Sequence, residues 1–191
     1  MRKIIGFKLP LRVKELQRRA RKAGIGLSAA GLDEAALASL LARAGRACTP
    51  SVVFDTFSHP DPEGALLNSM PGLAYSLVLV TLGKGFEDFR ETAAREDPPS
   101  APLWPVAQEV LLEEAVRFAT SLLDDEAARE SCELSPITTL AQASEVEAAL
   151  KKLDGSKIGV SLEGGRLKPP ATLAVSLSWL SKSKTRGKSK S

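Results

Sequence analysis

The chain has 191 residues, enough to bury one hydrophobic core, or two small ones, without disulfide bonds or metal ions. Hydrophobic residues make up 43% of it and charged residues 26%, as in an ordinary globular protein, while an aromatic content of only 5% argues against a nucleic-acid surface built on base stacking. The longest apolar run, residues 72–82, is far shorter than the ~20 residues that cross a bilayer. We therefore expect neither a membrane nor a nucleic-acid partner.

The net charge of +3 is concentrated at one end of the chain. Five positive charges fall within the last eleven residues, so the remainder carries a net −2. Residues 181–191 are rich in lysine and serine and have no large apolar side chain, so they cannot offset an ordering cost of ~1–2 kcal/mol per residue. The sequence predicts one domain over residues 1–180 and a disordered basic tail over residues 181–191. A further reading has this tail attach to nucleic acid or another anionic surface, in a strongly salt-dependent way.

The cysteine content indicates a cytoplasmic protein with free thiols. Cys48 and Cys132 are too few for the disulfide framework of a small secreted domain, and Lys8 interrupts the short apolar run near the amino end, which argues against a signal peptide. We expect Cys48 to pack at a helix end and Cys132 to be the more exposed thiol. His59 is the single histidine, which excludes a multi-histidine metal site.

The amino-terminal third predicts a strand and two helices. Residues 4–9 are typical of a short strand, and a helix with a strongly basic outer face follows from near Pro10, where a proline suits a first helical position. Residues 33–47 predict a second helix, for which Asp33 is a candidate N-cap. Its expected buried stripe is Leu37, Leu40, Leu41 and Ala44.

The middle of the chain predicts two strands and a helix. Residues 51–57 are rich in β-branched and aromatic side chains and favour a strand. Residues 73–82 are almost continuously apolar, which indicates a strand buried on both faces and therefore central in the sheet. A charged helix over residues 86–96 and a proline-rich loop over residues 97–102 follow.

The last third predicts a long core helix, a shorter helix and a hairpin. Residues 105–128 have a continuous apolar face that includes Leu122, so this helix should anchor the core. Ser144 and Glu147 have the spacing of a capping box at the start of the next helix. Two glycines at 164–165 favour a tight hairpin turn.

Residues 157–172, Lys-Ile-Gly-Val-Ser-Leu-Glu-Gly-Gly-Arg-Leu-Lys-Pro-Pro-Ala-Thr, resemble the closing hairpin of the activation domain of cobalamin-dependent methionine synthase. Residues 4–10 with Lys14-Glu15-Leu16 are similar to the amino-terminal segment of stand-alone members, and residues 81–83 to their post-strand turn. In their joint order, these segments extend the resemblance over about residues 3–180. It implies an α+β fold, a twisted and mostly antiparallel sheet with packed helices, which the mixed periodicities allow.

In that family the domain binds S-adenosylmethionine and presents its methyl group to a cobalamin whose cobalt has drifted to the inactive Co(II) state. An electron from flavodoxin or a similar donor then permits remethylation. The resemblance thus implies a stand-alone protein that assists reductive remethylation of a cobalamin held by a partner corrinoid protein or by methionine synthase modules. It does not imply that this chain binds cobalamin itself.

The resemblance also implies residues that contact S-adenosylmethionine. One is a glutamate on the long helix, with which Glu114 aligns. The others belong to a loop in which an arginine is followed two residues later by alanine or serine, then proline, glycine and tyrosine. Here that loop is residues 132–140, and it retains Ser135 and Pro136.

The same loop departs from the family pattern at three positions. Glu133 stands in place of the arginine, and Ile137 and Thr138 replace glycine and tyrosine. A carboxylate cannot supply the donor fork of an arginine, and losing one charged hydrogen bond costs about 1.5–3 kcal/mol. Arg129 lies nearby in the sequence as a possible substitute. These departures predict weak binding of S-adenosylmethionine, and they leave open the alternative of a non-catalytic binding module that has lost this site.

Overall fold

Six strands form one antiparallel sheet in the computed structural model, which describes residues 1–27, 31–62, 64–68 and 70–182. Their order is β1-β2-β3-β8-β4, and β5 also pairs with β8. The strands are β1 (Arg2–Ile5), β2 (Ser51–Ser58), β3 (Ala74–Thr81), β4 (Cys132–Leu134), β5 (Thr138–Thr139) and β8 (Thr172–Ser181). The predicted α+β class and the antiparallel sheet are confirmed.

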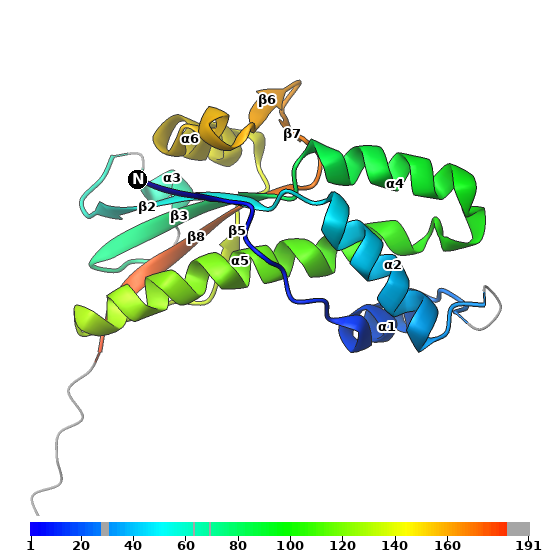
Figure 1. The fold of residues 1–191 in the computed structure, drawn as a ribbon. Coiled ribbons are helices and arrows are strands. Elements are labelled where there is room, and N and C mark those ends of the chain that lie inside the picture. The colour runs from blue at the N-terminus through cyan, green and yellow to red at the C-terminus, as the bar shows by residue number, and fades with distance from the viewer. Residues whose placement is uncertain (28–30, 63, 69, 183–191) are drawn as a thin grey trace, which may run out of the picture.

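Helices cover both faces of this sheet (Figure 1). Helix α5 (Leu103–Arg129) packs on one face, and on the same side α1 (Val13–Lys22) packs against α2 (Glu34–Ala47) and α5, and α2 against α4 (Lys84–Glu96). On the other lie α6 (Ala143–Leu153) and the short α3 (Gly64–Leu67). Short 3₁₀ segments occupy Pro98–Ser100 and Gly155–Ile158, and a separate hairpin is formed by β6 (Ser161–Glu163) and β7 (Arg166–Lys168). The helices thus enclose two hydrophobic clusters, one on each face of a single sheet.

Strand β3 lies in the middle of the sheet between β2 and β8, as its apolar sequence predicts. Val78 and Val80 join the cluster under α5, whereas Leu77 and Leu79 join the cluster under α6. Successive side chains of a strand point to opposite faces, so a strand buried on both faces must be apolar throughout.

The first strand is shorter than predicted. It ends at Ile5, because Gly6 adopts a φ of +73° and turns the chain, while its N–H donates to the Pro50 carbonyl over 2.8 Å. The following helix begins at Val13. In α2, by contrast, the predicted N-cap is confirmed, since the Asp33 carboxylate accepts a hydrogen bond from the Ala36 N–H over 2.7 Å.

The start of α6 lies two residues from the predicted capping box. The helix begins at Ala143, and the Glu145 carboxylate accepts hydrogen bonds from the N–H groups of Ala141 and Gln142, each over 3.0 Å. Ser144 is therefore already inside the first turn, where its hydroxyl is not needed as a cap. The prediction that Ser144 and Glu147 form the box was wrong.

The two-residue hairpin turn is confirmed. Gly164 and Gly165 have φ values of +57° and +76°, as the turn between β6 and β7 requires, and glycine adopts such values without steric cost.

Helix α5 covers the sheet as expected, but the burial of two side chains differs from the prediction. Leu123 is completely buried, while its neighbour Leu122 is only half-buried, so Leu122 lies at the margin of the apolar face. Cys132, expected to be the more exposed thiol, is 5% exposed, because β4 pairs with β8 and places its side chain in the core. Cys48 is the partly exposed thiol.

The described chain extends slightly past the predicted domain boundary at residue 180. Ser181 is the last residue of β8, and the Lys182 N–H donates to the Ser131 carbonyl over 3.2 Å. The rest of the predicted tail, residues 183–191, lies outside the described residues. No helix of the described part is long and apolar enough to cross a membrane.

Candidate functional site

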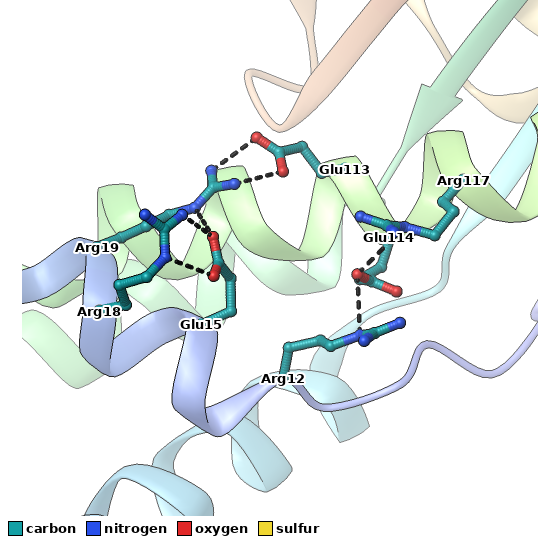
Figure 2. Close-up of polar contacts among 7 residues, drawn as sticks. All are labelled: Arg12, Glu15, Arg18, Arg19, Glu113, Glu114 and Arg117. Atoms are coloured by element: carbon teal, nitrogen blue, oxygen red, sulfur yellow. Dashed lines mark hydrogen bonds and ion pairs between the residues drawn. The ribbon is translucent and has the colours of Figure 1, made fainter.

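Glu114 is a buried carboxylate on α5, with an exposed fraction of 5%. It pairs with Arg12, which precedes α1, at 3.2 Å, and with Arg117, one turn along α5, at 3.5 Å (Figure 2). Burying a charge is costly unless it is paired, so the two arginines are what permit a glutamate at this position. The sequence does not reveal this burial, because a glutamate on a long helix is usually exposed.

Three further ion pairs lie beside Glu114, two of them within α1 and one, between Arg19 and Glu113, joining α1 to α5 (Figure 2). Arg19 donates two hydrogen bonds to Glu113, each 2.6 Å long, and a third of 2.6 Å to Glu15. Arg18 donates two more to Glu15. Hydrogen bonds from Arg18 and then Arg19 lower the pKa of Glu15 to about 2, and those from Glu113 and then Glu15 raise the pKa of Arg19. We call this set the charge network; its members are Arg12, Glu15, Arg18, Arg19, Glu113, Glu114 and Arg117.

Ser135 is bonded to β8, and its hydroxyl group already donates its hydrogen to a backbone carbonyl. Its Oγ accepts from the Ser178 N–H and donates to the Pro136 carbonyl, both over 2.9 Å. Its own N–H donates to the Ser178 carbonyl. Ser135 is 7% exposed, whereas Pro136 is exposed. Ser135 therefore anchors the loop to the sheet.

Arg129 lies far from Glu114. The two residues are fifteen positions apart on the same helix, which corresponds to about 22 Å at the rise of an α-helix. No single small molecule the size of a nucleoside would reach both side chains. The structure brings Glu114 close to Arg12 and Arg117, but it does not bring Arg129 into the same site.

The long helix and the altered loop nevertheless line one cleft, of about 440 Å³, between α5 and the β5–β8 edge of the sheet. We call it the α5 cleft. Its volume lies in the range usual for sites that bind small molecules. Its lining residues are Glu113, Val116, Arg117, Thr120, Ile137, Thr139, Leu173 and Val175.

The periodicity of the chain explains this lining. Positions 113, 116, 117 and 120 recur at the spacing of one helix face, and Ile137 and Thr139 alternate as on one face of a strand. Arg117 is three residues after Glu114, so helical spacing predicts that the two side chains are neighbours. The sequence alone does not tell which face of α5 meets the loop. Arg117 and Glu113 are thus the charged groups of the cleft that the sequence-based prediction missed.

Neither a metal centre nor a disulfide bond is present in the described residues. No group of three or more histidine, cysteine or acidic side chains there is arranged to hold a metal ion. Cys48 and Cys132 are both free, and burial raises the pKa of the Cys48 thiol to about 12, which keeps it protonated and slow to react at neutral pH.

The chain matches no protein-family model, and no curated protein matches it.

Proposed function

We propose that this protein is a cytoplasmic relative of the activation domain of cobalamin-dependent methionine synthase. It would assist the reductive remethylation of a cobalamin held by a partner corrinoid protein, with S-adenosylmethionine bound in the α5 cleft. The observation that supports this proposal most directly is that the two segments to which the resemblance assigns the ligand, α5 and the loop at residues 132–140, line the same cleft.

The side chains of the α5 cleft complement the parts of S-adenosylmethionine. Arg117 offers guanidinium donors to an amino-acid carboxylate, and Glu113 offers a carboxylate to an ammonium or sulfonium group. Val116, Leu173 and Val175 supply apolar area for a flat ring system. Arg117 would thus supply the guanidinium donors that Glu133, at the position of the family's arginine, cannot supply. The bound S-adenosylmethionine would supply the methyl group.

A second candidate function is that of a binding module without a small-molecule site. It is favoured because the polar side chains near the α5 cleft already bond to other protein groups. Ser135 bonds to β8, Glu114 pairs with Arg12 and Arg117, and Glu113 pairs with Arg19. Thr138 and Thr139 pair with β8 as a short strand. Of these residues Glu113 and Thr139 line the α5 cleft, so a ligand there must compete with Arg19 for the Glu113 carboxylate, which supports weak affinity.

Titration calorimetry with S-adenosylmethionine separates the two functions. If the first holds, the wild-type protein binds it, and Arg117→Ala lowers the affinity by about tenfold or more, the equivalent of one charged hydrogen bond. Glu114 keeps Arg12 as a partner in this variant, so the fold should persist. Arg129→Ala is the matched control, because Arg129 is an exposed arginine of the same helix outside the cleft.

Absence of binding, combined with retention of the protein on an immobilised corrinoid protein, would assign the second function instead. If the protein neither binds S-adenosylmethionine nor is retained on the corrinoid protein, both proposals are overturned.

A further inference from the structure

A second cleft, of about 530 Å³, lies between the segment that joins β1 to α1 and the last turns of α2. We call it the α2 cleft. It shares no lining residue with the α5 cleft. Its walls come from residues 6–11 on one side and residues 42–50 on the other, within the described part of the chain.

The lining is mostly apolar, with Thr49 and two cations as its polar side chains. Phe7, Leu9 and Leu11 form much of one wall, and the charged lining residues are Lys8 and Arg46, both exposed. No acidic residue lines the cleft. An apolar recess whose charged groups are all positive complements a molecule with an apolar body and a negative head.

The α2 cleft is formed before any ligand arrives, because specific contacts hold its walls. The ring of Phe7 stacks on Phe118 of α5 at a centroid distance of 4.2 Å, and the Gly6 N–H bonds the Pro50 carbonyl. At position 45 a Cβ would lie 3.3 Å from Leu11, so glycine there lets the segment approach the helix closely. A preformed recess avoids the cost of ordering its walls upon binding.

The end of α2 sets where a negative head can lie. The last carbonyl groups of a helix carry a partial negative charge and repel an anion, whereas a cation in the last turn offsets them. Arg46 is the basic residue of that turn. The head group should therefore lie near Lys8 and Arg46, and the apolar body against Leu9 and Leu11.

We propose that the α2 cleft binds an amphiphilic anion, a small apolar chain or ring system with one carboxylate or phosphate head group held by Lys8 and Arg46. This binding is independent of the function proposed for the α5 cleft.

Cys48 provides a local readout, because it lines the α2 cleft and is partly exposed, while Cys132 is buried. Decanoate serves as the probe. Because burial raises the pKa of this thiol and slows its reaction, mass spectrometry follows the labelling of Cys48 by excess N-ethylmaleimide over hours at mildly alkaline pH. We expect decanoate to slow the labelling of Cys48, and decan-1-ol to protect it about tenfold less effectively at equal concentration, since it lacks the charge. Decyl phosphate distinguishes the head groups: whichever anion protects at lower concentration identifies the head group that the cleft prefers.

Charge reversal tests the two cations. Lys8→Glu with Arg46→Glu should weaken protection by decanoate by about tenfold or more. Lys3→Glu with Lys14→Glu changes the net charge equally at exposed lysines outside the cleft and should leave protection unchanged. Equal protection by decanoate and decan-1-ol, equal effects of the two double variants, or no protection at all would each overturn the proposal. S-Adenosylmethionine should not protect Cys48, so neither proposal depends on the other.

Discussion

At the scale of single residues, the charge network combines one buried carboxylate with several exposed pairs. Glu114 is buried and depends on its partners, whereas Arg18 and Glu15 lie at the surface, where screening by water makes an ion pair worth little. Arg19 differs from both, because its planar guanidinium bridges Glu15 on α1 and Glu113 on α5. Arg19 therefore adds a polar link between α1 and α5 to the packing of Leu16 and Ala20.

Glu15 gives this network a predictable pH dependence. Its pKa falls from the ordinary value of 4.5 to about 2 in the folded protein, so its contribution to stability is complete above pH 4.5 and is lost as the pH falls towards 2. Glu15→Gln should therefore be less stable than the wild type at pH 7, with a difference that shrinks below pH 4.5 and vanishes near pH 2. Urea unfolding across this range measures it.

The size of this effect should be small, because Glu15 and Arg18 face water. Glu163→Gln is the control, since no ion pair of Glu163 is found in the described residues. A difference between Glu15→Gln and the wild type that persists unchanged at pH 2 would show that the charge of Glu15 does not cause it.

At the scale of elements, α5 contributes both to the core and to the α5 cleft, and its two faces explain why. Leu111, Ala115, Ala119 and Leu123 pack on the sheet, while Glu113 and Arg117 lie toward the cleft. Leu122 and Leu123 both belong to the apolar face, but Leu122 lies at its margin and packs only partly against the core.

Truncation at these two leucines tests the phase of α5. Leu123→Ala should cost about 2–5 kcal/mol, because it leaves a cavity in a completely buried position. Leu122→Ala should cost about 1 kcal/mol, since part of this side chain already meets water. Guanidinium unfolding of both variants checks the order, and a larger loss at Leu122 would contradict the position of α5 on the sheet.

At the scale of the whole molecule, the elements could be predicted from local patterns, while their boundaries and the clefts could not. Asp33, the apolar run of β3 and the glycines of the hairpin each act within a few residues, so the sequence contains the complete signal. The burial of Glu114 depends on Arg12, about a hundred residues away, and the α5 cleft depends on how a helix meets a loop. Contacts between residues so far apart in the chain produce no periodic pattern in a single sequence, so they could not be predicted from it.

The carboxyl end offers a test of where the folded domain stops. Residues 183–191 contain no large apolar side chain, so truncation after Lys182 should change the free energy of unfolding by less than about 0.5 kcal/mol. Truncation after Leu180 also removes Ser181, which pairs with Cys132, and the Lys182 N–H that bonds Ser131. It should cost about 1–2 kcal/mol, the net worth of one or two hydrogen bonds. Urea unfolding of the two truncated proteins measures the difference, and equal stability would place the domain boundary before Ser181.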